Sequence, residues 1–423
     1  MEQLIVSLDS EEATDAARFG PKAANLAALG RAGLPIPGGF CVDAQAYRLQ
    51  LENLGLQESA RAVMTADGPA ARRHAVAMKL GLLERAIPPS MHDALLAAWR
   101  RLLGASGAQG VVRSSALVED RFGSSFAGQF ESYLGLDGED DFATAVRACW
   151  AALWSTRALR YMATHDIDPA HTAMAVLVQP LVCARASGGG LSLTAEGGML
   201  LSATWGLGSA IAQGEVVPDR VVLTREGELR DNAPGRKFHA VGCAHGTRPV
   251  SRSLVTAPCL GHDEARELGR LLRRAEDVLG MPVEIEWALD DRGFKLLQAR
   301  ALHVGPAAVP DEIWLQHPRL NGHPAGIGWG TGRACVINCE CELARVAPGD
   351  VLVTRVAGPA LSEVLPRVAA VVAELGGSTS HLASLARERG VPMVLGVLDA
   401  TRHIPDGSQV AVDGVAGVVR WMA

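Results

Sequence analysis

The segment covering residues 368–392 constrains the fold more than any other part of this 423-residue chain. Residues 368–373 form an apolar run that predicts a buried strand, and Gly-Gly-Ser-Thr-Ser at 376–380 predicts a tight turn. A helix is expected over 381–389, because Gly390 and a nearby proline form a stop signal. A strand, a turn and a helix in this order are typical of a mixed α/β domain.

His381 is the first residue of the expected helix, on a loop that leaves the carboxyl end of a strand. Backbone N–H groups at a helix start, together with the Thr379 and Ser380 hydroxyls, can hold a dianionic phosphoryl group. Histidine is also a good nucleophile toward phosphorus at neutral pH. A histidine in this position can equally cap the helix or face solvent, so the spacing alone leaves both interpretations open.

The first 300 residues alternate between helical and strand patterns. Glycine and proline signals predict helices over 19–33, over 44–105 with a break at Pro88 and Pro89, and over 144–162. Short apolar runs predict strands over 110–115, 174–181, 187–194 and 199–204.

Lys22 lies in the first turn of the helix expected over 19–33, where a positive charge opposes the helix dipole. Projection of the side chain into solvent would explain this position. A bound anion at the helix start would explain it as well, although a lone lysine is a weak indication.

Residues 282–300 predict a β-hairpin with a three-residue loop at 291–293. That register places Glu286 directly opposite Gln298, with Arg300 two residues further along the same face. An ordinary exposed polar face explains this alternation. Carboxylate and amide oxygens that hold Mg²⁺, beside an arginine for phosphate, explain it equally.

The composition is that of a soluble globular enzyme. Hydrophobic residues make up 48% of the chain, the net charge is −6, and no basic stripe indicates nucleic acid as the main partner. The N-terminus lacks a basic start followed by an apolar block, and the apolar runs are too short to span a bilayer. We therefore expect a cytoplasmic protein without a membrane partner.

Eight cysteines are scattered through the chain. Cys335, Cys339 and Cys341 lie close together, but their spacing is not CxxC and no matching His or Cys pair follows. We expect reduced thiols on strands and turns rather than a metal site.

Residues 302–320 contain three prolines and no clear periodicity, which predicts a linker. We therefore divide the chain into residues 1–304, a linker over 305–321, and a compact mixed unit over 322–423. The last of these has a normal size for a small domain.

The sequence at 376–387, which runs on to Gly390, Val391 and Pro392, closely resembles the phosphohistidine signature of the phosphoenolpyruvate-utilising family. That family includes phosphoenolpyruvate synthase, pyruvate phosphate dikinase and rifampicin phosphotransferase. Further segments look like other parts of the same swivelling domain, at 348–354, 366–372, 404–407 and 412–414.

The first 300 residues resemble the same family's ATP-grasp-type nucleotide-binding domain. The matching segments are 20–26, 112–115, 125–129, 178–180, 205–208, 285–287 and 298–300. The resemblance covers most of the chain in the family's order. It implies an α/β fold in which an ATP-grasp-type domain is joined by a linker to a small swivelling phosphohistidine domain.

The resemblance also implies a site for ATP and Mg²⁺. Lys22 and Arg113 would contact the ATP phosphates, and Arg300 would steady a phosphate. Glu286 and Gln298 would hold Mg²⁺. Other residues would lie around the nucleotide: Gly128, Ser132, Tyr133 and Gln179. Bound polyphosphate would then account for the unusual position of Lys22 and for the polar face of the hairpin.

The chemistry implied by the resemblance passes the ATP β-phosphoryl group to His381, gives AMP, and releases the γ-phosphate as phosphate. Cationic side chains and the metal would offset charge on the phosphoryl oxygens in the transition state. The catalytic residues would be His381, Lys22, Arg113 and Arg300. The histidine domain would then swing to the acceptor, with the predicted linker as its hinge.

The sequence departs from the family where the acceptor is concerned. The relatives carry a large acceptor-binding domain, whereas only about 25 residues lie between Arg300 and Gly326, too few for a domain. We therefore expect a small-molecule acceptor that binds between the domains or is brought by a partner protein, and not pyruvate on this chain alone. Two other hypotheses are activation of an acceptor for condensation or dehydration, and a phosphocarrier role.

Two residues also differ from the family's usual motifs. Pro21 stands where the family usually has glycine, and Leu382 where it usually has alanine; neither change removes a chemical group.

Overall fold

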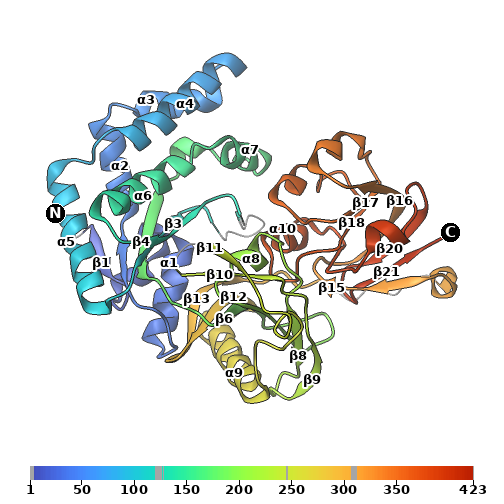
Figure 1. Cartoon of the computed structure of the whole chain (residues 1–423). Coiled ribbons are helices and arrows are strands. Elements are labelled where there is room, and N and C mark those ends of the chain that lie inside the picture. The colour runs from blue at the N-terminus through green and yellow to red at the C-terminus, as the bar shows by residue number, and fades with distance from the viewer. Residues whose placement is uncertain (1–3, 120–125, 127, 244–245, 306–311, 423) are drawn as a thin grey trace. The chain divides into compact units, whose positions relative to one another are not determined.

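The computed structural model describes residues 4–119, 126, 128–243, 246–305 and 312–422 (Figure 1). The chain falls into two compact units. Unit 1 comprises Met1–Val182 with Lys295–Arg300, and unit 2 comprises Cys183–Phe294 with Ala301–Ala423. The described residues combine helices with several sheets, so the predicted α/β class is confirmed. None of their helices is long and apolar enough to cross a membrane.

An antiparallel sheet with the order β1-β2-β5-β3-β4 lies at the centre of unit 1. Its strands are β1 (Ile5–Ser7), β2 (Phe40–Val42), β3 (Gly110–Ala116), β4 (Ser132–Leu136) and β5 (Met174–Pro180). β3 and β5, both predicted, are buried along almost their whole length. They show no alternation because α1 (Ala16–Arg31) and α6 (Glu139–Ala152) both pack against them.

The other predicted helices of unit 1 are also confirmed, with more breaks than expected. Pro88 precedes the last helix of the 44–105 stretch, and Pro89 occupies its first position, where a missing N–H is tolerated. Asp43 and Asp67 cap two of the others with their side chains. The helices are α2 (Ala44–Asn53), α3 (Gln57–Thr65), α4 (Gly68–Glu84), α5 (Pro89–Ser106) and α7 (Thr156–Thr164), with 3-10 turns η1 (Glu12–Thr14) and η2 (Pro169–His171).

Helix α1 begins three residues earlier than predicted, because the Asp15 side chain caps a backbone N–H at 2.8 Å. Gly20 interrupts it with a φ of 76°. A Cβ at Gly20 would lie 2.5 Å from the Ser115 carbonyl oxygen, so the position requires glycine. The helix resumes at Pro21 and places Lys22 in a first turn, as predicted.

Unit 2 contains a sheet with the order β13-β12-β6-β7-β8-β9, called here the six-stranded sheet. Its strands are β6 (Ala186–Leu191), β7 (Met199–Trp205), β8 (Asp219–Leu223), β9 (Leu229–Ala233), β12 (Val283–Asp290) and β13 (Gly293–Ala301), the last mostly grouped with unit 1. Helix α9 (His262–Leu279) packs against β7, β8 and β12 (Figure 1). The strands predicted over 187–194 and 199–204 are confirmed as β6 and β7, which pair antiparallel.

The predicted hairpin is formed by β12 and β13, but its loop is one residue shorter than expected. Only Asp291 and Arg292 separate the two strands. Gly293, predicted as the last loop residue, has the expected positive φ of 103° but already begins β13.

A fully buried ion pair, Lys237 with Asp219, anchors the segment that follows β9. Asp219 also accepts hydrogen bonds from the backbone N–H groups of Gly235 and Cys259, each at 2.7 Å. The buried carboxylate is therefore well supplied with donors, which such a pair needs to be tolerated. The segment also includes β10 (His239–Gly242) and β11 (Gly246–Pro249), and α8 (Ser209–Ala212) packs against β10.

The C-terminal part of unit 2 is built on a sheet with the order β14-β21-β20-β16-β17-β18-β19-β15. Strands β16 to β19 run parallel, and the other pairs are antiparallel. The strands are β14 (Arg319–Asn321), β15 (His323–Pro324), β16 (Trp329–Ile337), β17 (Val351–Thr354), β18 (Ala370–Ala373), β19 (Met393–Leu395), β20 (Gln409–Asp413) and β21 (Val418–Trp421). The limits of the linker at 305 and 321 stay predictions.

The core of this C-terminal sheet consists mainly of valine and alanine side chains, and helices and 3-10 turns precede or connect its strands. They are α10 (His381–Arg389), α11 (Ala400–His403), η3 (Glu312–Gln316), η4 (Glu340–Arg345) and η5 (Pro359–Glu363). Helix α10 packs against η5, which in turn packs against η4.

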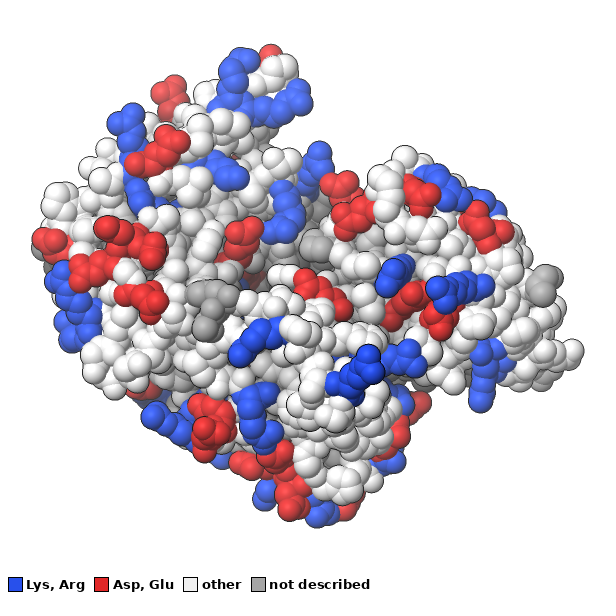
Figure 2. All heavy atoms as spheres, in the orientation of Figure 1, with Lys and Arg blue, Asp and Glu red and all other residues white. Residues whose placement is uncertain are grey.

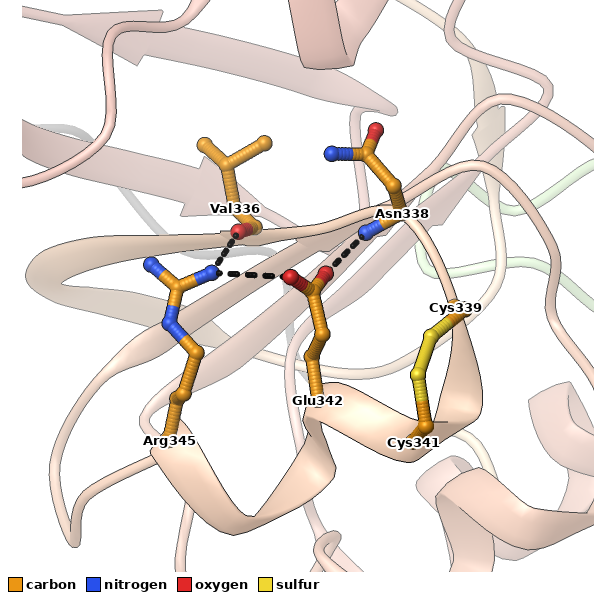
Figure 3. Close-up of a disulfide and its surroundings, with 6 residues drawn as sticks. All are labelled: Val336, Asn338, Cys339, Cys341, Glu342 and Arg345. Carbon is orange, nitrogen blue, oxygen red and sulfur yellow. Dashed lines mark hydrogen bonds and ion pairs between the residues drawn. A yellow bond between two sulfur atoms is a disulfide. The ribbon is translucent and has the colours of Figure 1, made fainter.

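The expectation that Cys339 and Cys341 are reduced thiols is wrong, because the structure joins them in a disulfide (Figure 3). Cys339 is extended just before η4, so the chain turns at once and brings the two Cα atoms to 5.3 Å. Glu342 accepts from the Asn338 N–H at 2.7 Å and secures the same turn. Cys335 is a buried free thiol on β16.

Charged side chains of both signs are interspersed over the face shown in Figure 2. In the described structure, exposed charges of opposite sign pair with each other, as Arg100 does with Glu139 at 2.6 Å and Arg266 with Glu228 at 2.6 Å. This face therefore presents no extended surface of a single sign, in keeping with a net charge of −6.

Candidate functional site

The loop before His381 leaves β18 and is closed by its own backbone. Gly376 has a φ of 98°, and the N–H of Ser380 donates to the Gly377 carbonyl at 3.1 Å. Ser380 then caps α10, because its Oγ accepts from the Ala383 N–H at 3.2 Å. The predicted strand, turn and helix are confirmed, and His381 is the first residue of α10.

Two hydroxyls of this loop, Ser378 Oγ and Thr379 Oγ1, are buried without a hydrogen-bond partner among the described residues. A buried hydroxyl without a partner costs free energy. A ligand with several acceptor oxygens, such as a phosphoryl group, would supply the missing partners. The Ser380 oxygen, by contrast, already accepts a bond in the helix cap. The loop thus offers Thr379, which was predicted for this role, and Ser378, which was not.

The same loop packs against the six-stranded sheet of unit 2. A Cβ on Gly189 of β6 would lie 2.5 Å from the Cβ of Thr379, so the loop fits only because β6 carries glycine there. The Gly376 N–H donates to the Val216 carbonyl at 3.0 Å. Gly189 is the register partner of Glu286 on β12. Thr379 therefore lies beside the strand position of the predicted Mg²⁺ ligand.

A buried ion pair ties α10 to β12. Arg387 Nη2 lies 2.9 Å from Glu284 Oε2, and the two side chains are only 6% and 7% exposed. Ser384 Oγ donates to the same carboxylate at 3.1 Å. Arg387 Nη1 donates to the Ser378 carbonyl at 2.6 Å, so one guanidinium contacts both the sheet and the loop before His381. Sequence patterns gave no sign of this pair, because its members are 103 residues apart.

Lys22 of unit 1 has two partners within the protein. Its Nζ donates to the Ser114 carbonyl at 2.7 Å and lies 3.2 Å from Glu119 Oε1. The Lys22 side chain is 13% exposed, so projection into solvent does not explain its position. Glu119 was not assigned a role from the sequence, since its position beside Lys22 is visible only in three dimensions.

Arg113 lies on β3, next to Ser114, whose carbonyl accepts the hydrogen bond from Lys22. Its Nη1 donates to the Leu297 carbonyl at 2.7 Å, and its Nη2 donates to Gln298 Oε1 at 2.9 Å. Unit 1 thereby brings Arg113 and Gln298 into contact, while Lys22 bonds to Ser114, the chain neighbour of Arg113; we call these residues the cluster.

The remaining predicted nucleotide-binding residues of unit 1 lie on neighbouring strands. Ser132 and Tyr133 are on β4, opposite β3. Burial raises the pKa of the Tyr133 hydroxyl, which donates to Glu131 at 3.4 Å. Gln179 is buried on β5 and donates to the Gly38 carbonyl at 3.2 Å.

For two predicted residues, Arg300 and Gly128, the structure gives burial or backbone conformation. Arg300 is 8% exposed on β13. Gly128 has a left-handed φ of 68°, in a motif whose Ser125 and Ala127 lie outside the described residues. The structure therefore gives Gly128 a conformation suited to glycine without tying it to the cluster.

The predicted metal ligands, Glu286 and Gln298, are on the neighbouring strands β12 and β13. Mg²⁺ on a nucleotide takes few protein ligands and completes its coordination with phosphate oxygens and water. One carboxylate and one amide oxygen fit that requirement. Among the described residues no group of three or more His, Cys, Asp or Glu side chains could hold a metal ion without such help.

Residues 16–316 match the family described as pyruvate phosphate dikinase, AMP/ATP-binding domain. Residues 346–417 match the family described as PEP-utilising enzyme, mobile domain. The first match covers most of the chain, which therefore belongs to the pyruvate phosphate dikinase family of nucleotide-binding domains, followed by the mobile domain of PEP-utilising enzymes. The family predicted from the sequence motifs is confirmed.

Curated relatives match over almost the whole chain. The phosphoenolpyruvate synthase of Aeropyrum pernix is 32% identical, and the match covers 99% of this chain and 58% of that protein. The phosphoenolpyruvate synthase of Pyrococcus furiosus is 30% identical over 96% of this chain and 57% of its own length. That of Pseudomonas aeruginosa is 31% identical over 99% and 57%. The chain thus spans somewhat more than half the length of these relatives.

Proposed function

We propose that this chain transfers the β-phosphoryl group of ATP to His381, with AMP and phosphate as products, and that the phosphohistidine passes the group to a small-molecule acceptor. The observation that carries the proposal is the position of the histidine loop. Thr379 packs on Gly189 of β6, and Gly189 is paired with Glu286 on β12. The loop therefore contacts the sheet next to Glu286, which is a predicted ligand of the Mg²⁺ that accompanies ATP. The nucleotide-binding family match supports ATP as the donor.

The cations of unit 1 would bind the ATP phosphates by exchanging acceptors. Lys22 and Arg113 donate here to backbone carbonyls and to side-chain oxygens. Phosphate oxygens are stronger acceptors than carbonyls, and the bidentate guanidinium suits them. Arg300, buried on the hairpin strand β13, would contribute a third positive charge.

In the transfer step, a ring nitrogen of His381 forms a bond to the β-phosphorus. The bond from that phosphorus to the oxygen bridging it to the α-phosphate breaks, and AMP leaves with that oxygen. Hydrolysis of the β–γ bond consumes one water and releases phosphate. Mg²⁺ held by Glu286 and Gln298 would neutralise charge on the phosphate oxygens. The Ser378 and Thr379 hydroxyls would donate to the phosphoryl group once it is on the histidine.

The acceptor is proposed as a small molecule, bound by this chain or brought by a partner protein. The relatives are named for the synthesis of phosphoenolpyruvate. Pyruvate is therefore the first acceptor to test, although the chain spans only part of those relatives.

The proposal is tested by incubation with Mg²⁺ and ATP labelled at the β-phosphate. We expect acid-labile label on the wild-type protein, no label on His381→Ala, and AMP rather than ADP as the nucleotide product. Equal labelling of the two proteins, or formation of ADP alone, would show that the proposal is wrong. Loss of label on addition of pyruvate would identify the acceptor.

A further inference from the structure

We propose that Arg387 and Glu284 are positioning residues that hold the His381 loop on the six-stranded sheet, and that their ion pair opens when the phosphohistidine leaves that sheet. The proposal rests on the function proposed above and deepens it, since it concerns how the histidine is presented to the donor. It assigns Arg387 no contact with ATP.

The first observation is that the pair is buried where α10 meets the sheet. Glu284 is on β12, two residues before Glu286, and Arg387 is in the last turn of α10. Their 2.9 Å contact is reinforced by Ser384, whose hydroxyl donates to the same carboxylate at 3.1 Å. Three polar groups from two elements thus satisfy one another in a place that excludes water.

The second observation is that Arg387 also determines the shape of the loop. Its Nη1 donates to the Ser378 carbonyl at 2.6 Å, three residues before His381, while Nη2 reaches Glu284. A guanidinium is planar and rigid, so its two sides cannot be oriented independently. The geometry of the histidine loop is therefore coupled to the contact with β12.

The third observation is that close approaches and a backbone hydrogen bond contribute to the same contact between the loop and the six-stranded sheet. Gly189 and Gly376 supply the approaches, with the Gly376 N–H donating to the Val216 carbonyl. Such contacts depend on fit and carry little specific attraction of their own. The ion pair is a charged interaction between α10 and β12, and we infer that its opening helps to release the loop.

Removing one member of a buried pair leaves the other charge without its partner as long as the loop stays on the sheet. The single variants Arg387→Met and Glu284→Gln should therefore favour the undocked state. Replacing both members with apolar residues of similar size removes the unpaired charge and should restore docking in part. If the effects of the two substitutions were simply additive, the double variant would dock less well than either single variant.

The experiment compares two phosphoryl donors on the full chain. Phosphoramidate phosphorylates histidine directly and needs no nucleotide site, whereas ATP requires the docked loop. Arg387→Met should reduce labelling of His381 from ATP by roughly tenfold or more. Its labelling from phosphoramidate should be unchanged or faster.

The double variant Glu284→Leu with Arg387→Met should regain much of the labelling from ATP. Arg389→Met, a neighbouring half-buried arginine of the same helix, is the matched control and should behave like wild type.

Unchanged labelling of Arg387→Met from ATP would contradict the proposal. So would an equal loss of labelling from both donors, since a general folding defect would have that effect. If the wild-type chain takes label from phosphoramidate but not from ATP, the proposed function fails. Hydrogen exchange then decides on the ion pair: both single variants should raise exchange at 376–380 and in β12, and unchanged exchange would overturn the inference.

Discussion

The two groups of candidate residues differ in how completely the protein satisfies their polar atoms. In unit 1, Lys22 and Arg113 already donate to carbonyls and to side-chain oxygens. In unit 2, the Ser378 and Thr379 hydroxyls are buried without partners among the described residues. If ATP binds as proposed, the cations must exchange their partners, whereas the two hydroxyls can donate to a phosphoryl group without giving up a partner among the described residues. We therefore expect ATP binding to depend on unit 1, and phosphorylation of His381 to depend on the loop in unit 2.

The largest effect is expected from Arg113→Met. Loss of one charged donor to the phosphates should lower labelling of His381 from ATP by about a hundredfold or more. Labelling from phosphoramidate should not change, because that donor bypasses unit 1. Arg147→Met is the control, since Arg147 bonds only within its own helix among the contacts described. If Arg113→Met lost labelling from ATP and from phosphoramidate to the same extent, the two units would not have the separate roles inferred here.

Acid should destabilise unit 2 through His323. Burial lowers the pKa of His323 from 6.5 to about 4, and the Arg220 charge adds to the effect. The unfolded chain then binds a proton that the folded chain does not, so stability falls as the pH drops from 6.5 to 4. The loss should reach roughly 3 kcal/mol.

Urea unfolding at pH 7 and pH 4.5 measures most of this loss, which is complete only below pH 4. His323→Gln should show a smaller pH dependence than wild type, and His262→Gln, at an exposed position, should match wild type. If His323→Gln retained the full pH dependence, the effect would have to be assigned to other groups.

A smaller effect is expected from Gly189→Ala. The added Cβ would lie 2.5 Å from that of Thr379, so the loop could not seat on β6 without a shift. Labelling from ATP should fall by about tenfold, as a displacement of this size misplaces the reacting nitrogen. Gly246→Ala, with open space around its Cβ, is the control. Full activity of Gly189→Ala would show that the transfer does not need this contact.

The smallest effect is expected from Thr379→Val, which keeps the shape and removes the hydroxyl. Labelling should fall a few-fold, because one donor to the phosphoryl group is lost. Stability should rise by up to about 1 kcal/mol, since a buried hydroxyl without a partner is removed. Thr379→Ser keeps the donor and should retain activity. Lower stability with unchanged labelling would indicate that Thr379 has a purely structural role.

Local features of the site could be predicted from the sequence, and long-range ones could not. The strand, turn and helix around His381 follow from glycine and proline signals within 25 residues, and the structure has them at nearly the expected bounds. The seating of Thr379 on Gly189 and the Arg387–Glu284 pair join segments far apart in the chain, which no spacing rule reaches. The Cys339–Cys341 disulfide was not predicted, because reduced thiols are expected in a cytoplasmic protein and the turn that brings the two residues together has no sequence signal.

The central claim is that His381 carries the phosphoryl group. Mass spectrometry of alkali-preserved peptides after incubation with Mg²⁺ and ATP tests it most directly. The account predicts one added phosphoryl group on His381 itself, together with AMP in solution. Phosphate on another residue, or AMP formed with an unmodified His381, would contradict it.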